Sequence, residues 1–173
     1  MNVTKALAFG LFISLLLSSC GWYLRGAAPI SGIIFTSLSV TGGGEVRRAL
    51  ETKLRNADQP ALSPSIASYK LSIDESREVD NVSLDDNARA SEIEAELEIR
   101  YSLLDSDNLA LAEDRSITVQ RIISVDANNL NASETELEET WQQLTASATS
   151  QLIRQLSIQS SLLSAQQDKS DRP

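Results

Sequence analysis

The chain alternates between apolar and polar residues without a break over residues 92–103, and all the polar ones but Ser102 are charged: Glu92-Ile93-Glu94-Ala95-Glu96-Leu97-Glu98-Ile99-Arg100-Tyr101-Ser102-Leu103. In a β-strand successive side chains point to opposite faces, so this segment would place all its apolar side chains on one face and its glutamates on the other. A helix would scatter the same residues around its circumference. The period therefore predicts a half-buried strand with an acidic outer face.

Two weaker alternating segments flank this strand. The first runs from Ala67 to Asp74, and the second runs from Ser116 to Val125 with Ile117, Val119 and Ile123 on one side. The segment Asp105–Asn108 has the composition of a hairpin turn. We predict a meander of three antiparallel strands.

The region before the meander predicts a strand followed by a helix. Residues 33–40 are rich in β-branched and apolar residues, and Gly42-Gly43-Gly44 ends that strand. Val46, Leu50 and Leu54 then recur every four residues among charged ones, which is typical of an amphipathic helix ending near Asp58. The three glycines are not followed by the Lys of a phosphate-binding loop, so we interpret them as a flexible turn.

A second helix is predicted from Ser133 onward. Ser133 and Glu136 have the spacing of a capping box. A continuous apolar stripe follows at spacings of three and four residues: Leu137, Trp141, Leu144, Ala148, Leu152 and Leu156. Residues 165–173 have no apolar period and are predicted to be a disordered tail.

The element order β-α-β-β-β-α predicts an α+β fold. We expect a two-layer sandwich in which a four-stranded, mostly antiparallel sheet packs two helices on one face. Residues 20–164 would form this single domain.

Composition excludes several function classes. The 173 residues carry 15 Lys and Arg against 24 Asp and Glu, a net charge of −9, which argues against nucleic-acid binding. The chain has no His and a single Cys, so it lacks the residues of Ser-His and Cys-His catalysis and of Cys and His zinc sites. A Ser-Lys hydrolase would have to use Lys70, which lies on the polar side of a strand. We expect no enzyme, no cofactor and no metal.

The N-terminus predicts an exported lipoprotein. Lys5 precedes an uncharged apolar run that is too short to span a bilayer, which is typical of a signal peptide over residues 1–19. Leu17-Ser18-Ser19-Cys20 matches the lipobox, so Cys20 would carry acyl chains such as palmitate and become the first residue of the mature protein. The alternative is an ordinary signal peptide with a chance Cys at the cleavage point.

The charged residues offer two candidate sites. The glutamate row at residues 92–98 could suggest carboxylate catalysis or calcium binding, but a row along an exposed strand provides neither a cleft nor a shell of oxygens around one ion. We interpret it as a solvated face. Arg77 and Arg89 flank the connection between the second and third strands, where paired arginines could bind phosphate oxygens.

Several short motifs together resemble the LptE family of lipopolysaccharide-assembly lipoproteins. The sequence Cys20-Gly21-Trp22-Tyr23-Leu24-Arg25 is similar to the start of the mature family members, and Gln151-Leu152-Ile153-Arg154-Gln155-Leu156 is similar to their last helix, with Gln155 in place of Lys. Ala88-Arg89-Ala90-Ser91-Glu92-Ile93 keeps the Arg and Glu of the family's Gly-Arg-x-Ala-Glu-Tyr.

This resemblance implies a lipoprotein of the outer membrane, anchored at Cys20 on the periplasmic side. It would plug the lumen of the β-barrel protein LptD in a one-to-one complex, support assembly of that barrel, and take part in lipopolysaccharide transport to the outer leaflet. Arg89 is then the first candidate for contact with lipopolysaccharide phosphates, and Arg77 the second. The competing hypothesis is a free outer-membrane lipoprotein that binds a small ligand or peptidoglycan in the periplasm.

Overall fold

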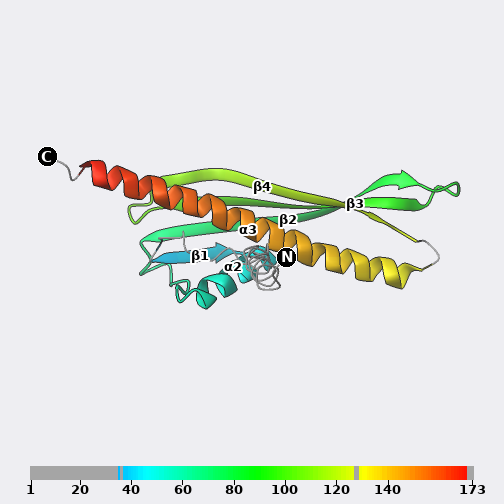
Figure 1. Ribbon diagram of the computed structural model, residues 1–173, viewed down its shortest axis with the longest axis horizontal. Coiled ribbons are helices and arrows are strands. Elements are labelled where there is room, and N and C mark those ends of the chain that lie inside the picture. The colour runs from blue at the N-terminus through cyan, green and yellow to red at the C-terminus, as the bar shows by residue number, and fades with distance from the viewer. Residues whose placement is uncertain (1–34, 36, 127–128, 171–173) are drawn as a thin grey trace, which may run out of the picture.

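The computed structural model describes residues 35, 37–126 and 129–170. The predicted signal peptide, Cys20 and the residues that open the mature chain lie outside this range. Six elements follow one another along the chain (Figure 1): β1 (Leu38–Gly42), α2 (Gly44–Asn56), β2 (Tyr69–Leu84), β3 (Ala90–Leu104), β4 (Ala110–Ser124) and α3 (Leu130–Ser170).

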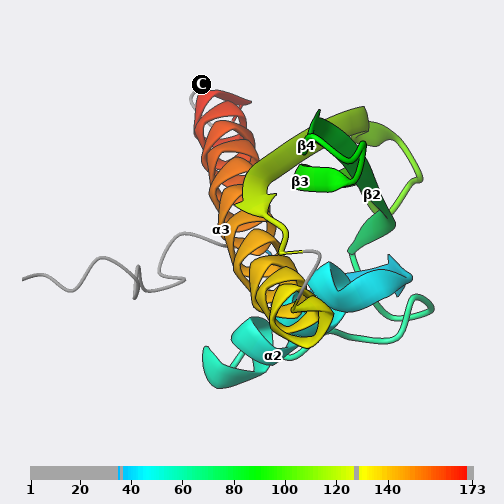
Figure 2. The ribbon, with the colours of Figure 1, turned by 90° about the vertical axis from the view of Figure 1, so that its right-hand side faces the viewer.

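The four strands form one sheet in the order β1-β2-β3-β4. β1 pairs parallel to β2, and the other two pairs are antiparallel. The sheet curls so that its concave face turns toward α3, and α2 lies beside α3 below β1 (Figure 2). The predicted α+β sandwich, with a mostly antiparallel four-stranded sheet and two helices on one face, is confirmed; β1 and β2 form the one parallel pair.

β3 runs through the middle of the core, as its alternation predicts. Ala95, Leu97, Ile99, Tyr101 and Leu103 are buried, while the glutamates between them point to the opposite face. The predicted apolar stripes of both helices pack against this strand and its neighbours, since Leu50, Leu54, Leu152 and Leu156 are almost fully buried. Burial of one such leucine is worth about 2–5 kcal/mol relative to alanine.

Two strands are longer than predicted. β2 continues ten residues past Asp74 to Leu84, and β4 begins at Ala110, six residues before Ser116. The register between β2 and β3 stays regular from Lys70 to Asn81. β1 pairs only with Tyr69–Ile73, so β2, β3 and β4 extend beyond it as a three-stranded ribbon (Figure 1).

Both ends of α3 also differ from prediction. The helix begins at Leu130, so Ser133 lies inside its first turn and the predicted capping box is wrong. The Ser133 hydroxyl instead donates a hydrogen bond to the Asn129 carbonyl and accepts one from the Asp126 N–H. The helix ends at Ser170, so residues 165–170 of the predicted disordered tail are helical. Ala, Gln and Lys favour helix, and no Gly or Pro interrupts the chain there, which accounts for the extension.

α3 spans 41 residues, which corresponds to roughly 60 Å. Within the described part of the chain, no helix combines the length and apolarity needed to cross a membrane.

Candidate functional site

Arg89 ends the turn that joins β2 to β3. The Asp85 carboxylate holds this turn, because it accepts the backbone N–H groups of Asn87 at 2.8 Å and Arg89 at 2.9 Å. The Arg89 guanidinium returns to the same carboxylate with an Nη2–Oδ2 distance of 2.8 Å. These hydrogen bonds from Arg89 lower the pKa of Asp85 below its ordinary value of 3.8.

Ala88 stands in this turn at the position where the Gly-Arg-x-Ala-Glu-Tyr motif has glycine. Ala88 adopts a φ of +58°, the left-handed conformation that glycine occupies most easily. The β3–β4 turn is built in the same way, since Asp105 accepts two backbone N–H groups and Asn108 has a φ of +62°. The turn therefore holds Ala88 in a left-handed conformation and places Arg89 at the end of the ribbon.

Arg89 remains accessible in spite of its ion pair. Its side chain is 47% exposed, and the exposed apolar side chains of Val82 and Leu84 lie just before the turn. Ile122 of β4 is exposed as well and lies opposite Glu94 near the same end of the ribbon. A cation and apolar side chains are thus presented together to solvent.

Arg77 is placed differently from the prediction. It does not flank the β2–β3 connection, because β2 continues past it and pairs it with Leu97 in the middle of the ribbon. Its Nε lies 3.0 Å from Glu75 Oε1, and its guanidinium lies 5.2 Å from the centre of the Trp141 ring of α3. The seven residues from Arg77 to Leu84 span roughly 23 Å, so the structure does not bring Arg77 and Arg89 together.

Glu75 of β2 contacts α2 directly and α3 through Arg77. Its side chain is only 5% exposed, and its Oε2 accepts the backbone N–H of Val46 at 2.8 Å. The N-cap residue of α2, Gly43, offers no side chain, so the carboxylate of β2 caps the helix instead. The chain of contacts runs from α2 through Glu75 and Arg77 to Trp141.

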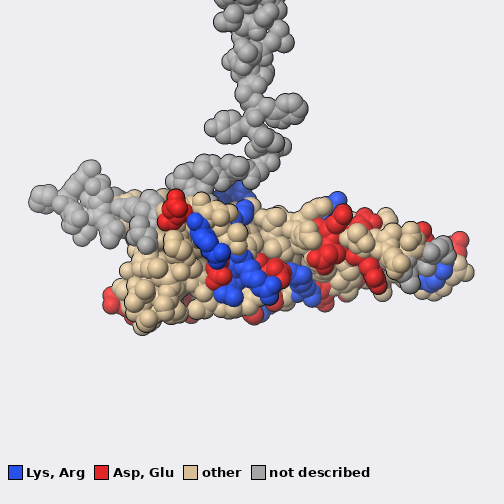
Figure 3. Space-filling view, turned by 90° about the horizontal axis from the view of Figure 1, so that it is seen from below, with Lys and Arg blue, Asp and Glu red and all other residues tan. Residues whose placement is uncertain are grey.

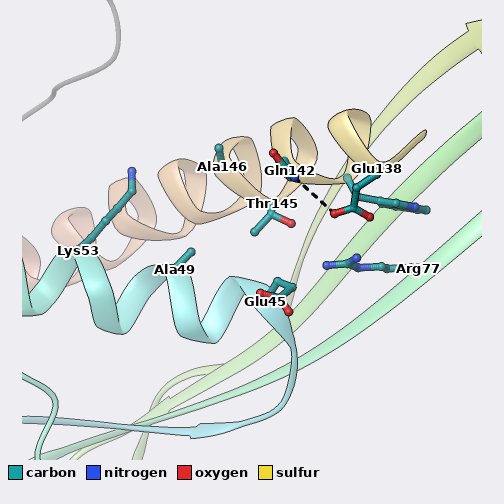
Figure 4. A pocket seen from close by; sticks show the side chains of 9 residues that line it. Glu45, Ala49, Lys53, Arg77, Glu138, Gln142, Thr145 and Ala146 are labelled. Atoms are coloured by element: carbon teal, nitrogen blue, oxygen red, sulfur yellow. Dashed lines mark hydrogen bonds between the residues drawn. The ribbon is translucent and has the colours of Figure 1, made fainter. Parts of the chain in front are cut away.

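A groove of about 550 Å³ opens beside Arg77, between α2 and α3 (Figure 4). Glu45 of α2 and Glu138 of α3 lie near the Arg77 guanidinium, and Lys53 lies at the far end of the groove (Figure 4). Trp141, Gln142 and Thr145 line the wall formed by α3. The groove carries charges of both signs. Arg77 covers the face of Trp141, so this ring offers no open surface in the groove on which a sugar could stack.

The acidic face of the sheet is larger than the predicted glutamate row. Glu78 pairs directly with Glu96, and Asp80 pairs directly with Glu94, on the face that points away from the helices. Opposed carboxylates at this spacing repel each other. Sequence reasoning missed Glu78 and Asp80 because it ended β2 at Asp74; the absence of Gly and Pro through Leu84 is the signal that could have extended the strand.

The described residues contain no group of three His, Cys, Asp or Glu side chains placed to hold a metal ion. The carboxylates of the acidic face line up along the strands and do not converge on a point. What the described surface offers is charged and apolar contact area.

Comparison with known proteins agrees with this architecture. A family model described as LptE, lipopolysaccharide-assembly, matches residues 31–156. No curated protein matches the chain.

Solved structures give the same fold. The solution structure of uncharacterized lipoprotein B from Nitrosomonas europaea is 26% identical, with a TM-score of 0.66 over 82% of this chain and 93% of that one. Rare lipoprotein B from Shewanella oneidensis is 18% identical, with a TM-score of 0.63 over 74% of this chain and 97% of that one. A minor lipoprotein from Acinetobacter baumannii is 15% identical, with a TM-score of 0.56 over 73% of this chain and 93% of that one.

The matched residues include β1, α2, the complete meander and the buried stripe of α3 as far as Leu156. The family model therefore covers the two layers of the fold and the turn that carries Arg89. The chain belongs to the LptE family of lipopolysaccharide-assembly proteins.

Proposed function

We propose that this protein is an outer-membrane lipoprotein, anchored through acyl chains on Cys20, that plugs the lumen of the LptD β-barrel and helps to move lipopolysaccharide to the outer leaflet. Membership of the LptE family supports the general role in lipopolysaccharide assembly. The protein would act by binding and positioning, without catalysis.

The end of the ribbon carries the proposal for lipid contact. Lipopolysaccharide presents phosphate groups next to acyl chains, and the turn presents the Arg89 guanidinium next to exposed Val82 and Leu84. Guanidinium groups bind phosphate oxygens in a planar, bidentate manner. Binding would require Arg89 to exchange Asp85 for a phosphate, which is a local change in an exposed ion pair.

The polar outer face of the sheet supports the proposal of a plug. Barrel lumens are polar, and the face of β3 that points away from the helices carries Glu94, Glu96, Glu98 and Arg100. Such a surface can meet a lumen through hydrogen bonds and charges.

The first experiment tests the partner. The protein is expressed from its own signal in a Gram-negative host and purified in mild detergent through a C-terminal tag. We expect LptD to co-purify at one-to-one stoichiometry through a high-salt wash, and mass spectrometry to find acyl chains on Cys20. Recovery of the lipoprotein without a barrel would contradict the plug and favour the free periplasmic binder.

The second experiment tests the lipid contact. Arg89→Glu should abolish cross-linking of lipopolysaccharide to the turn while the barrel still co-purifies. Arg48→Glu is the matched control, because Arg48 is also exposed and paired with a nearby carboxylate, at 2.7 Å from Glu45, but lies on α2, away from both the turn and the outer face of the sheet. Equal cross-linking in both variants would refute a role for Arg89.

A further inference from the structure

In the described part of the chain, no strand pairs with the outer edge of β2 beyond β1. β1 covers β2 only as far as Ile73, and among the described strands none pairs with this edge from Asp74 to Leu84. Tyr69 donates its N–H to the Ser37 carbonyl, so the odd-numbered residues of β2 direct their backbone groups toward the β1 side. The register is regular to Asn81. Arg77, Val79 and Asn81 therefore present their backbone N–H and C=O groups along the free edge.

The free edge lies beside an acidic face of α3. Glu138 and Gln142 line the groove beside Arg77 of β2, and Glu134 and Glu139 lie next to them on the surface of α3. Gln143 instead bonds to Arg121 of β4, which places the opposite side of the helix at the other edge of the sheet. Seen from below, acidic side chains gather toward the end at which α3 begins (Figure 3).

Carboxylates therefore border the edge on both sides. Glu78 and Asp80 lie on the outer face of the sheet and oppose Glu96 and Glu94, while Glu134 and Glu138 lie on the helix. The one cation of β2 in this stretch, Arg77, is already paired with Glu75 and stacked on Trp141. An exposed strand edge is a template for strand addition, and its side chains select the partner by charge.

We propose that the β2 edge from Asp74 to Asn81 binds an extended, basic segment of a protein partner as an additional strand. The added strand would continue the line of β1 past the start of α2. It would exchange hydrogen bonds with Arg77, Val79 and Asn81 and place lysine or arginine beside Glu78 and Asp80. A second copy of this chain fits poorly, since pairing the same edges would bring Glu78 and Asp80 against further carboxylates. Strand addition at this edge does not require the proposed barrel partner to be bound.

The test uses the full-length protein in mild nonionic detergent and a dye-labelled peptide of alternating lysine and valine. A peptide of alternating glutamate and valine is the matched control for strand propensity. We expect saturable binding of the lysine peptide, with slowed hydrogen exchange at Arg77 and Val79, and no binding of the glutamate peptide. Equal binding of both peptides, or protection elsewhere, would overturn the proposal.

Two variants separate backbone pairing from simple charge attraction. Val79→Pro removes an outward N–H without removing a bond to β3, and should weaken binding about tenfold, whereas Val79→Thr should bind as the native protein does. The double change Glu78→Lys and Asp80→Lys should reverse the preference toward the glutamate peptide. If Val79→Pro, shown by circular dichroism to be folded, binds as tightly as Val79→Thr, strand addition is wrong.

Discussion

Ala88 holds a backbone conformation that destabilises a residue with a side chain. Its φ of +58° is in the left-handed region, where L-residues lose about 1–2 kcal/mol relative to glycine. We therefore expect Ala88→Gly to raise the free energy of unfolding by about 1 kcal/mol, after allowance for the greater freedom of glycine in the unfolded chain. Urea denaturation measures the change. Ala90→Gly, two residues later in β3, should lower stability instead, and a loss of stability in both variants would contradict this account of the turn.

The three consecutive glycines are not equivalent. Gly44 has a φ of +90°, and a Cβ there would lie 2.2 Å from Glu75 Oε2. Gly44→Ala should therefore destabilise the protein by about 2 kcal/mol, because it adds backbone strain and displaces the cap of α2. A Cβ on Gly43 would meet nothing within 4 Å, so Gly43→Ala should change the midpoint of thermal unfolding little. Similar losses in the two variants would show that the glycines serve only as a flexible link.

Asp85 should remain ionised to unusually low pH. The hydrogen bonds from Arg89 and Asn87 lower its folded pKa below 3.8, so its contribution to stability is present above the pKa of the unfolded chain and is lost as pH falls through the folded value. NMR titration of the Asp85 carboxyl carbon should give a midpoint below 3.8. Arg89→Gln should move that midpoint upward, and an unchanged midpoint would show that the guanidinium does not hold the turn.

Single residues were predictable where their role is local. The buried face of β3 follows from its alternation, and Arg89 lies beside the β2–β3 connection as predicted. The contacts of Arg77 were not predictable, because they depend on α2 and α3, which are distant in sequence. Gln155 is a further case, since its side-chain carbonyl accepts the hydroxyl of Tyr101 across the core.

At the scale of elements, α2 depends on β2 for its first turn. Glu75→Gln keeps the size of the side chain but removes its charge, which weakens the bond to the Val46 N–H and the ion pair with Arg77. We expect a loss of about 1–2 kcal/mol in urea denaturation, with the amides of the first turn of α2 exchanging faster. Glu78→Gln is the control on the same strand, and it should be neutral or stabilising because Glu78 faces Glu96. Equal effects would mean that Glu75 acts only through general charge.

The ends of elements were predicted less well than their centres. The buried half of β2 shows alternation, whereas the half beyond Ile73 is mostly exposed and lacks an apolar period. Its strand conformation is imposed by the backbone ladder to β3. For the same reason no pattern marked the start of β4, whose first residues are held by pairing with Leu103 and Leu104.

At the scale of the whole molecule, the sandwich was predictable and the projecting ribbon was not. The apolar stripes specify which faces must meet, so the number of layers and the packing of both helices follow from the sequence. They do not specify how far β2, β3 and β4 run past β1, because that depends on relative strand length. Both candidate surfaces, the turn with Arg89 and the free edge of β2, arise from this difference in length.

The order of the strands in the sheet has a consequence for how the chain reaches its native state. β2, β3 and β4 are neighbours both in sequence and in space, so the two hairpins can close early over short loops. β1 pairs parallel across an intervening helix, and α3, which covers β3 and β4, follows all four strands along the chain. Until α3 docks, the apolar side of these hairpins stays exposed to water, so the chain is most prone to self-association in the interval between hairpin closure and the docking of this helix.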